Sequence, residues 1–220
     1  MEKKEMIRND ILQIGNFEVE AVSTKIKLDQ NESPYRLPKK LRKKISSPLF
    51  NTISENRYPQ PCDYFEKKSK IGEYFGISPE NLAFTAGADQ AILGLMMVTK
   101  KRVLMLSPTY PIYHNDAIIL QRDTEYFKMD EGNAFSFTGL EKKQDFDLVC
   151  LVSPNPPAGN LISFDIIREL CSNNSVVLLD EAYYEISNVS HIGLLKEFSN
   201  LVLIRTLSKA CSLAGMRREF

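Results

Sequence analysis

From residue 82 onward the chain alternates short apolar runs with helical patterns, and this alternation limits its fold more than any other feature. Six short segments have the composition of strands: residues 82–85, 102–107, 124–128, 147–153, 176–180 and 201–206. Five helical patterns accompany them: residues 89–98, 112–120, 137–143, 164–171 and 192–198. Strands that alternate with helices form a parallel sheet with helices on both faces. The sequence therefore predicts an α/β fold, a three-layer sandwich around a mainly parallel sheet.

The first eighty residues have a different character from this alternating part. Residues 1–30 show no strong periodicity and are predicted to form an extended N-terminal arm, so that the domain proper comprises residues 31–220. Within that domain, helices are predicted at residues 38–46 and 63–75.

The charge composition argues against functions that depend on bulk charge. Lysine plus arginine total 28 and aspartate plus glutamate total 28, giving a net charge of zero. A binder of nucleic acid or of an anionic membrane through bulk charge is therefore not expected. No apolar stretch approaches the roughly 20 residues that span a bilayer. The four cysteines and two histidines lack metal-ligand spacing, which predicts free thiols in a reducing cytoplasm and no metal site.

Small or polar residues follow several predicted strands, at the edge where sheets of this kind bind ligands. Ala86-Gly87-Ala88-Asp89 opens a helix, whose N–H groups favour a phosphate, although small residues there can also serve packing alone. Tyr110 stands between two prolines, where it can stack on a ring or simply pack within its loop. Residues 154–160 contain three prolines and predict a rigid turn.

Two charged residues at strand ends carry the strongest chemical signal. Asp180 ends a run of four apolar residues, where an unpaired carboxylate is unfavourable to bury. Lys209 follows the last predicted strand among small residues, where its amine can act as a Schiff-base nucleophile, although most single lysines are simply solvated. A phosphate site, a stacking ring, an acid and such an amine together match the functional groups of pyridoxal phosphate.

The sequence from Thr206 to Arg217 reads Thr-Leu-Ser-Lys-Ala-x-x-Leu-Ala-Gly-x-Arg and resembles the lysine motif of fold-type I pyridoxal-phosphate aminotransferases. Three further segments resemble the histidinol-phosphate aminotransferase branch of that family: residues 28–35, 57–59 and 87–92. The resemblance implies transamination of histidinol phosphate, or of a related amino acid, with 2-oxoglutarate. A decarboxylase of the same fold, of the threonine-phosphate type, shares nearly all these motifs and is the alternative.

The resemblance implies roles for the residues around the cofactor ring. Lys209 would bind the cofactor aldehyde as a Schiff base and later move a proton. Asp180 would bond the pyridine nitrogen and keep it protonated. Tyr183 would bond the ring hydroxyl, and Tyr110 would stack on the ring.

The resemblance also implies a phosphate site, a substrate site and a partner subunit. The residues around the phosphate would be Ala88, Asp89, Thr206, Ser208 and Arg217. Asn31 and Tyr35 would lie near the substrate. Tyr58 would reach the phosphate of the neighbouring subunit, which implies a homodimer with shared sites.

Two residues of one loop depart from the family pattern, which there reads Asn-Pro-Thr-Gly with the asparagine bonded to the ring hydroxyl. Pro156 and Ala158 occupy the positions of the asparagine and threonine. Because Pro156 cannot donate, Tyr183 would be the principal partner of that hydroxyl. Asn155 is the candidate cofactor-binding donor of this loop, if the loop is shifted. A third departure is Cys211, which stands where the family usually has an aromatic residue.

After Arg217 the sequence reads Arg-Glu-Phe and stops, where the family continues into a small C-terminal domain. The resemblance therefore predicts a C-terminally truncated chain: a fragment, a frameshifted or prematurely terminated product, or an inactive remnant that binds cofactor or a partner without turnover. Little or no transamination is expected from the 220 residues alone.

Overall fold

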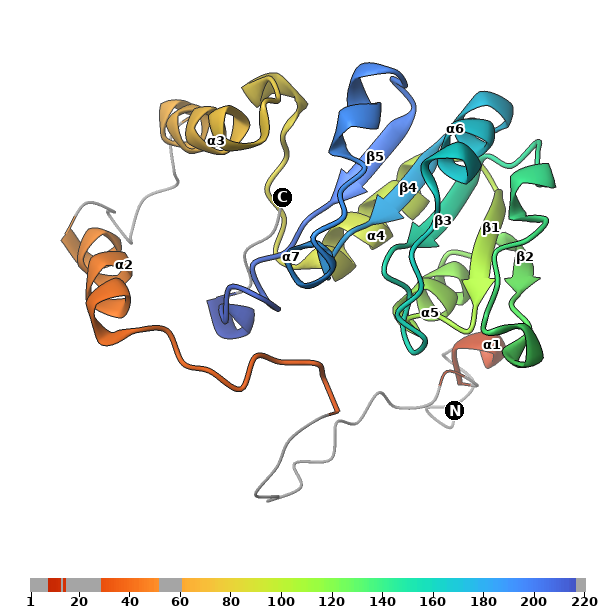
Figure 1. Cartoon of the computed structure of the whole chain (residues 1–220), viewed down its shortest axis with the longest axis horizontal. Coiled ribbons are helices and arrows are strands. Elements are labelled where there is room, and N and C mark those ends of the chain that lie inside the picture. Colours follow the sequence, from red (N-terminus) through yellow and green to blue (C-terminus); the bar gives the residue numbers. More distant parts are fainter. Residues whose placement is uncertain (1–7, 13, 15–28, 52–60, 217–220) are drawn as a thin grey trace.

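The computed structural model describes residues 8–12, 14, 29–51 and 61–216, and in them the chain forms a five-stranded sheet (Figure 1). The strands are β1 (Arg102–Ser107), β2 (Asp123–Lys128), β3 (Leu148–Val152), β4 (Val177–Asp180) and β5 (Leu201–Ile204). Their order is β2-β1-β3-β4-β5, and every neighbouring pair is parallel. The predicted α/β fold with a parallel sheet is confirmed.

Helices precede and connect these strands. The α-helices are α1 (Asn9–Leu12), α2 (Lys39–Asn51), α3 (Pro61–Phe75), α4 (Ala88–Val98), α5 (Ile112–Ile119), α6 (Phe164–Asn173) and α7 (Tyr184–Ser187). Short 3-10 helices are η2 (Pro79–Asn81), η3 (Glu131–Asn133), η4 (Leu140–Lys142), η5 (Ile192–Lys196) and η6 (Ala214–Met216). In Figure 1, α2 and α3 lie on the β5 side of the sheet. None of the helices in the described ranges is long and apolar enough to cross a membrane.

The central strand β3 separates two buried apolar layers, because successive side chains of a strand point to opposite faces. All five residues of β3 are buried. Val149 and Leu151 pack in the cluster that contains Ile167 and Leu170 of α6. The alternate residues of β3 pack in the second cluster, with side chains of α4 and α5. Helices therefore cover both faces of the sheet, which gives the three layers that the sequence predicts.

The strand predicted at residues 82–85 is wrong. Leu82 donates its N–H to the carbonyl of Pro79 at 3.2 Å, as part of the turn η2. Of these residues only Thr85 takes part in a β-bridge, so no continuous strand forms. A strand needs a run of backbone hydrogen bonds to a neighbour, and an apolar pattern cannot by itself supply that neighbour.

Two predicted helices form only short 3-10 turns. In residues 137–143, Gly139 has a φ of +91°, which interrupts a right-handed helix and leaves only η4 after it. Residues 192–198 form the 3-10 helix η5, with bonds such as Leu194 N–H to the His191 carbonyl. Both stretches are shorter than the length at which an isolated helix is stable, so local contacts decide their geometry.

The strand order reverses at β1, which pairs with β2 on one side and β3 on the other. In open parallel sheets, ligands bind outside the carboxyl ends of the strands at such a reversal. The loops that leave β1 and β3 begin here, at Pro108 and Ser153. The fold therefore places a candidate site at this edge.

The N-terminal arm predicted for residues 1–30 lies mostly outside the described residues, and its boundary remains a prediction. One described part contacts the sheet domain. Arg8 donates to the carbonyls of Ile118 and Ile119, at 3.1 and 2.9 Å, where α5 ends. This contact satisfies carbonyl groups that a helix end leaves without intrahelical partners.

Candidate active site

Asp180 lies at the carboxyl end of β4, with its side chain on the face covered by α4 and α5. The side chain is almost fully buried, with 4% of the residue exposed. Tyr113 of α5 donates its hydroxyl to Oδ2 at 3.0 Å, and the Ala182 N–H donates to Oδ1 at 2.9 Å. Both carboxylate oxygens thus have donors. The carboxylate that the sequence singled out is buried and held in one orientation.

Three predicted site residues that are far apart in the sequence lie close together in the structure: Lys209, Tyr183 and Asn31. Lys209 Nζ lies 5.9 Å from the centroid of the Tyr183 ring and donates to the Gln30 carbonyl at 2.9 Å. Asn31 Nδ2 donates to the Tyr183 hydroxyl at 3.0 Å. Because Tyr183 follows Asp180 by three residues, this group lies at the end of β4 as well. The structure thus brings the predicted amine, the ring-hydroxyl partner and one substrate residue together.

The loop after β5 presents Lys209 and encloses two hydroxyl side chains. Leu213 N–H donates to the Leu207 carbonyl at 3.1 Å and closes the loop on itself. Thr206 Oγ1 accepts from the Ser208 N–H at 2.9 Å, and both residues are buried. This local closure fixes the backbone on either side of Lys209.

The start of α4 forms the predicted helix N-terminus. Gly87 is its N-cap with a φ of +99°, a conformation that suits glycine, and no side chain caps the helix there. Ala88 and Asp89 form the first turn, whose N–H groups lack intrahelical acceptors. Asp89 Oδ1 accepts from the Tyr110 hydroxyl at 3.2 Å. Tyr110 thus connects the start of α4 to the loop after β1.

Asn155 joins the two loops at the reversal of strand order. Its Oδ1 accepts from Thr109 Oγ1 at 2.7 Å, and its Nδ2 donates to the Pro108 carbonyl at 2.9 Å. The residue is completely buried. Both ends of the amide are therefore occupied by the protein, while contact of Asn155 with a cofactor remains a prediction.

A buried charged network on the opposite face of the sheet was missed by the sequence analysis. Glu181 Oε2 lies 2.7 Å from Arg205 Nη2, and both side chains are at most 3% exposed. Glu181 Oε1 accepts from the His191 backbone N–H at 2.6 Å and lies 2.9 Å from Nδ1 of its ring. Nε2 of that ring lies 3.0 Å from the Ile162 carbonyl. We call Glu181, Arg205 and His191 the buried ion network.

The buried ion network connects the segments that follow β3, β4 and β5 through hydrogen bonds and an ion pair. Arg205 directly precedes Thr206, and its guanidinium lies 3.6 Å from the centroid of the Tyr184 ring. The sequence contains one indication of this network, the opposite charges of Glu181 and Arg205. Asp180 pairs with Ile204 in the sheet register, so the next residues along the two strands carry opposite charges and can meet. That signal is readable only after the strand pairing is known.

Tyr113 was also missed as a site residue. It lies on the first turn of α5, three residues after Tyr110 of the preceding loop. Burial raises the pKa of Tyr113 well above its ordinary value, and the nearby charge of Asp180 raises it further. The phenol is therefore protonated at any physiological pH and remains a donor.

One predicted site residue is not brought to this group, and two others are not among the residues that the structure describes. Tyr35 exposes 79% of its surface, and its N–H is bonded to Ser33, so its place near a substrate remains a prediction. Tyr58 and Arg217 lie outside the described residues.

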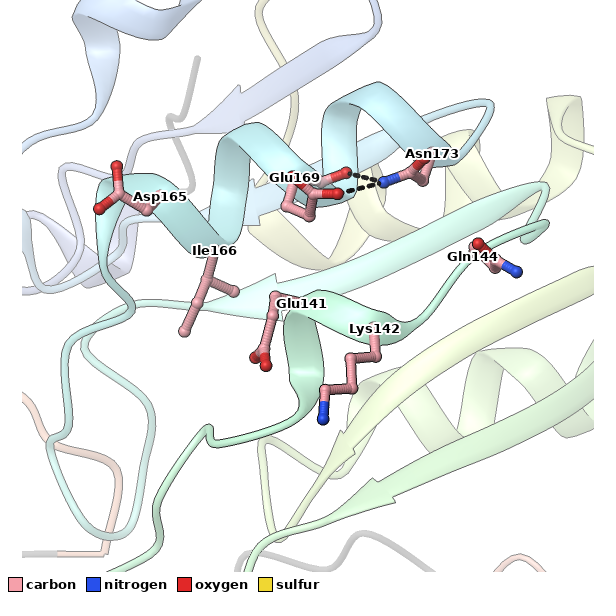
Figure 2. Close-up of a pocket in the computed structure, with 7 residues that line it drawn as sticks. All are labelled: Glu141, Lys142, Gln144, Asp165, Ile166, Glu169 and Asn173. Atoms are coloured by element: carbon pink, nitrogen blue, oxygen red, sulfur yellow. Dashed lines mark hydrogen bonds between the residues drawn. The ribbon is translucent and has the colours of Figure 1, made fainter.

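A separate surface pocket of about 530 Å³ lies between η4 and α6 (Figure 2). Its polar lining includes Glu141, Asp165 and Glu169, and Asn173 donates to both the carbonyl and the side chain of Glu169 at 2.9 Å. None of the predicted site residues lines it. The chemistry of the strand ends therefore does not extend to this pocket.

Comparison with known proteins shows the family. The model of aminotransferase class I and II matches residues 23–218, and the chain belongs to this family. The histidinol-phosphate aminotransferase 1 of Carboxydothermus hydrogenoformans is 36% identical over 99% of the chain. The histidinol-phosphate aminotransferase of Thermococcus kodakarensis is 35% identical over 96% of the chain. The chain spans 63% of the length of each of these relatives.

Solved structures show the same fold. The histidinol-phosphate aminotransferase of Clostridium acetobutylicum matches 86% of the chain and 57% of its own, with a TM-score of 0.74 and 23% identity. The Sinorhizobium meliloti enzyme, solved in complex with pyridoxal-5'-phosphate, matches 86% of the chain and 54% of its own, with a TM-score of 0.68 and 20% identity. The sheet and helices are therefore those of the large domain of such aminotransferases.

Proposed function

We propose that the protein contains the cofactor-binding domain of a pyridoxal-phosphate-dependent aminotransferase. Its substrates are histidinol phosphate, or a related amino acid, and 2-oxoglutarate. The main observation in support of this proposal is that Lys209 Nζ lies beside the Tyr183 ring at the end of β4, where the Asp180 carboxylate is also held. The family match supports the reaction type, and the histidinol-phosphate aminotransferases at 35 and 36% identity support the substrate.

The described residues fit pyridoxal phosphate at each of its functional groups. The buried Asp180 carboxylate suits a protonated ring nitrogen, which would satisfy its charge. The uncapped start of α4 and the nearly buried hydroxyls of Thr206 and Ser208 suit a phosphate. Lys209 supplies the amine. Tyr110, Tyr183 and Asn155 are the proposed contacts of the ring, and Ala88 and Asp89 those of the phosphate.

When bound, the cofactor supplies an aldehyde that takes up the substrate amine and a ring that accepts electrons from the bond being broken. The protein's own groups then handle protons and orientation. Lys209 Nζ, held between the Gln30 carbonyl and the Tyr183 ring, would carry the proton taken from the substrate carbon. Asp180 would hold the ring nitrogen protonated, and Asn31 would orient the Tyr183 hydroxyl.

Product analysis under single-turnover conditions tests this function. With stoichiometric loaded protein, we expect histidinol phosphate followed by 2-oxoglutarate to yield glutamate, and Lys209→Ala to yield none. Stoichiometric protein makes a single turnover detectable. Carbon dioxide from threonine phosphate would instead indicate the decarboxylase. Cofactor binding with neither product would indicate an inactive binder, and either result contradicts the proposal.

Pro156→Asn is expected to tighten cofactor binding. Proline has no side-chain donor, and a hydrogen bond to a charged group contributes roughly 1.5–3 kcal/mol. We therefore expect the dissociation constant, measured by absorbance titration, to fall about tenfold or more. Ala158→Asn, at an exposed position of the same loop, is the matched control and should leave binding unchanged. An unchanged constant in Pro156→Asn, with weakened binding in Asn155→Ala, would show that Asn155 is the donor.

The homodimer and the cytoplasmic location predicted from Tyr58 and the cysteines remain part of the proposal. Helix α3, which follows the segment that contains Tyr58, exposes aromatic side chains: 40% of Tyr64, 59% of Phe65 and 80% of Tyr74. A second copy of the chain is the partner proposed for this surface, which sedimentation velocity would test. Compact monomers at high concentration would contradict it.

A further inference from the structure

Tyr113 is a buried polar residue whose hydroxyl is bonded to Asp180. The residue is 1% exposed and lies in the apolar cluster between α4, α5 and the sheet. Its hydroxyl donates to Asp180 Oδ2 at 3.0 Å. A tyrosine hydroxyl placed in an apolar layer is stable only with such a partner. The contact therefore links α5 to the end of β4.

This contact fixes the rotation of the Asp180 carboxylate. The Ala182 N–H holds Oδ1 from within the same loop, whereas Tyr113 holds Oδ2 from a different element. Rotation about the Cβ–Cγ bond moves both oxygens together, so a donor on each oxygen restricts this rotation more than the backbone contact alone. With both donors present, the plane of the carboxylate is set by the packing of α5 on the sheet.

Tyr113 serves as a donor over the whole physiological pH range. Burial has the largest effect in raising its pKa, followed by the charge of Asp180. Cys150 and Asp89 raise the pKa in the same direction. An ionised phenol would lose the proton that it donates, so these effects preserve the contact.

We propose that Tyr113 is a positioning residue that holds the Asp180 carboxylate in the orientation and charged form required by the cofactor's ring nitrogen. This inference rests on the proposed function, because it assigns the ring nitrogen to Asp180. A group that acts only on this nitrogen should change binding of a cofactor that has the nitrogen. It should have little effect on an otherwise identical cofactor that lacks it.

The test compares pyridoxal phosphate with its 1-deaza analogue, in which a C–H replaces the ring nitrogen. Dissociation constants for both are measured by absorbance titration with the 220-residue chain and its variants. The wild-type chain should bind pyridoxal phosphate more tightly than the analogue. Tyr113→Phe should reduce this preference about tenfold, the size expected for loss of one hydrogen bond to a charged group.

Tyr110→Phe is the matched control, because it removes the same atom three residues away, in the loop before α5, from a bond to Asp89. It should change both dissociation constants by the same factor. An equal loss for both ligands in Tyr113→Phe would show a merely structural role and overturn the inference. If Asp180→Asn leaves the preference unchanged, the assignment of Asp180 in the proposed function fails. If Asp180→Asn removes the preference and Tyr113→Phe does not, only the inference about Tyr113 fails.

Discussion

Borohydride reduction of the protein incubated with pyridoxal phosphate is expected to fix the cofactor covalently at Lys209 and at no other internal site. The physical reason is local concentration. Lys209 Nζ is partly buried beside Tyr183, in the loop after β5 that Leu207 and Leu213 close, where a bound aldehyde would be held against the amine. Peptide mass spectrometry after digestion identifies the labelled lysine. The Lys209→Ala variant should lose essentially all of this label.

Lys196→Ala is the matched control, because Lys196 is exposed at the end of η5. It should retain the full label at Lys209. Surface lysines react slowly with excess aldehyde, so the labelling is followed at one equivalent of cofactor. Label that spreads over exposed lysines and persists in Lys209→Ala would refute the assignment of the amine.

Glu181→Ala should lower the free energy of unfolding by about 3–5 kcal/mol, the cost of leaving one member of a buried ion pair without its partner. Arg205 would then be buried with a positive charge, since its side chain is 3% exposed. His191 would lose the acceptor of its backbone N–H and of its ring. Urea denaturation of the cofactor-free chain, followed by circular dichroism, measures this change.

Glu197→Ala is the control for an ion pair in a different environment. Glu197 pairs with Arg168 at 3.0 Å, but both side chains remain over 40% exposed and solvated. Its removal should change stability far less than removal of Glu181. Equal effects of the two substitutions would contradict the view that burial makes the Glu181 pair important.

The positions of several candidate residues can be predicted from the sequence because the signals are local. Asp180 and Lys209 follow apolar runs, and the structure places Asp180 at the end of β4 and Lys209 in the loop after β5. Gly87 and the small residues beside it predicted a helix start, and α4 begins at Ala88. Chain neighbours fix such features, so the sequence pattern is sufficient to find them.

Other signals failed because they depend on distant neighbours. Residues 82–85 have a strand-like pattern, but the pattern does not contain the strand with which they would pair. Gly139 adopts a positive φ that ends a helical pattern, a choice that the apolar spacing around it does not reveal.

The parallel α/β sheet and the residues that end its strands can be predicted from the chain alone, because periodicity and strand-end polarity are properties of consecutive residues. Which side chains meet across those strands depends on the tertiary structure. The register of β4 and β5 brings Glu181 to Arg205, and the packing of α5 brings Tyr113 to Asp180. Both contacts join residues more than twenty positions apart. Their existence depends on strand pairing and helix docking, which no local pattern specifies.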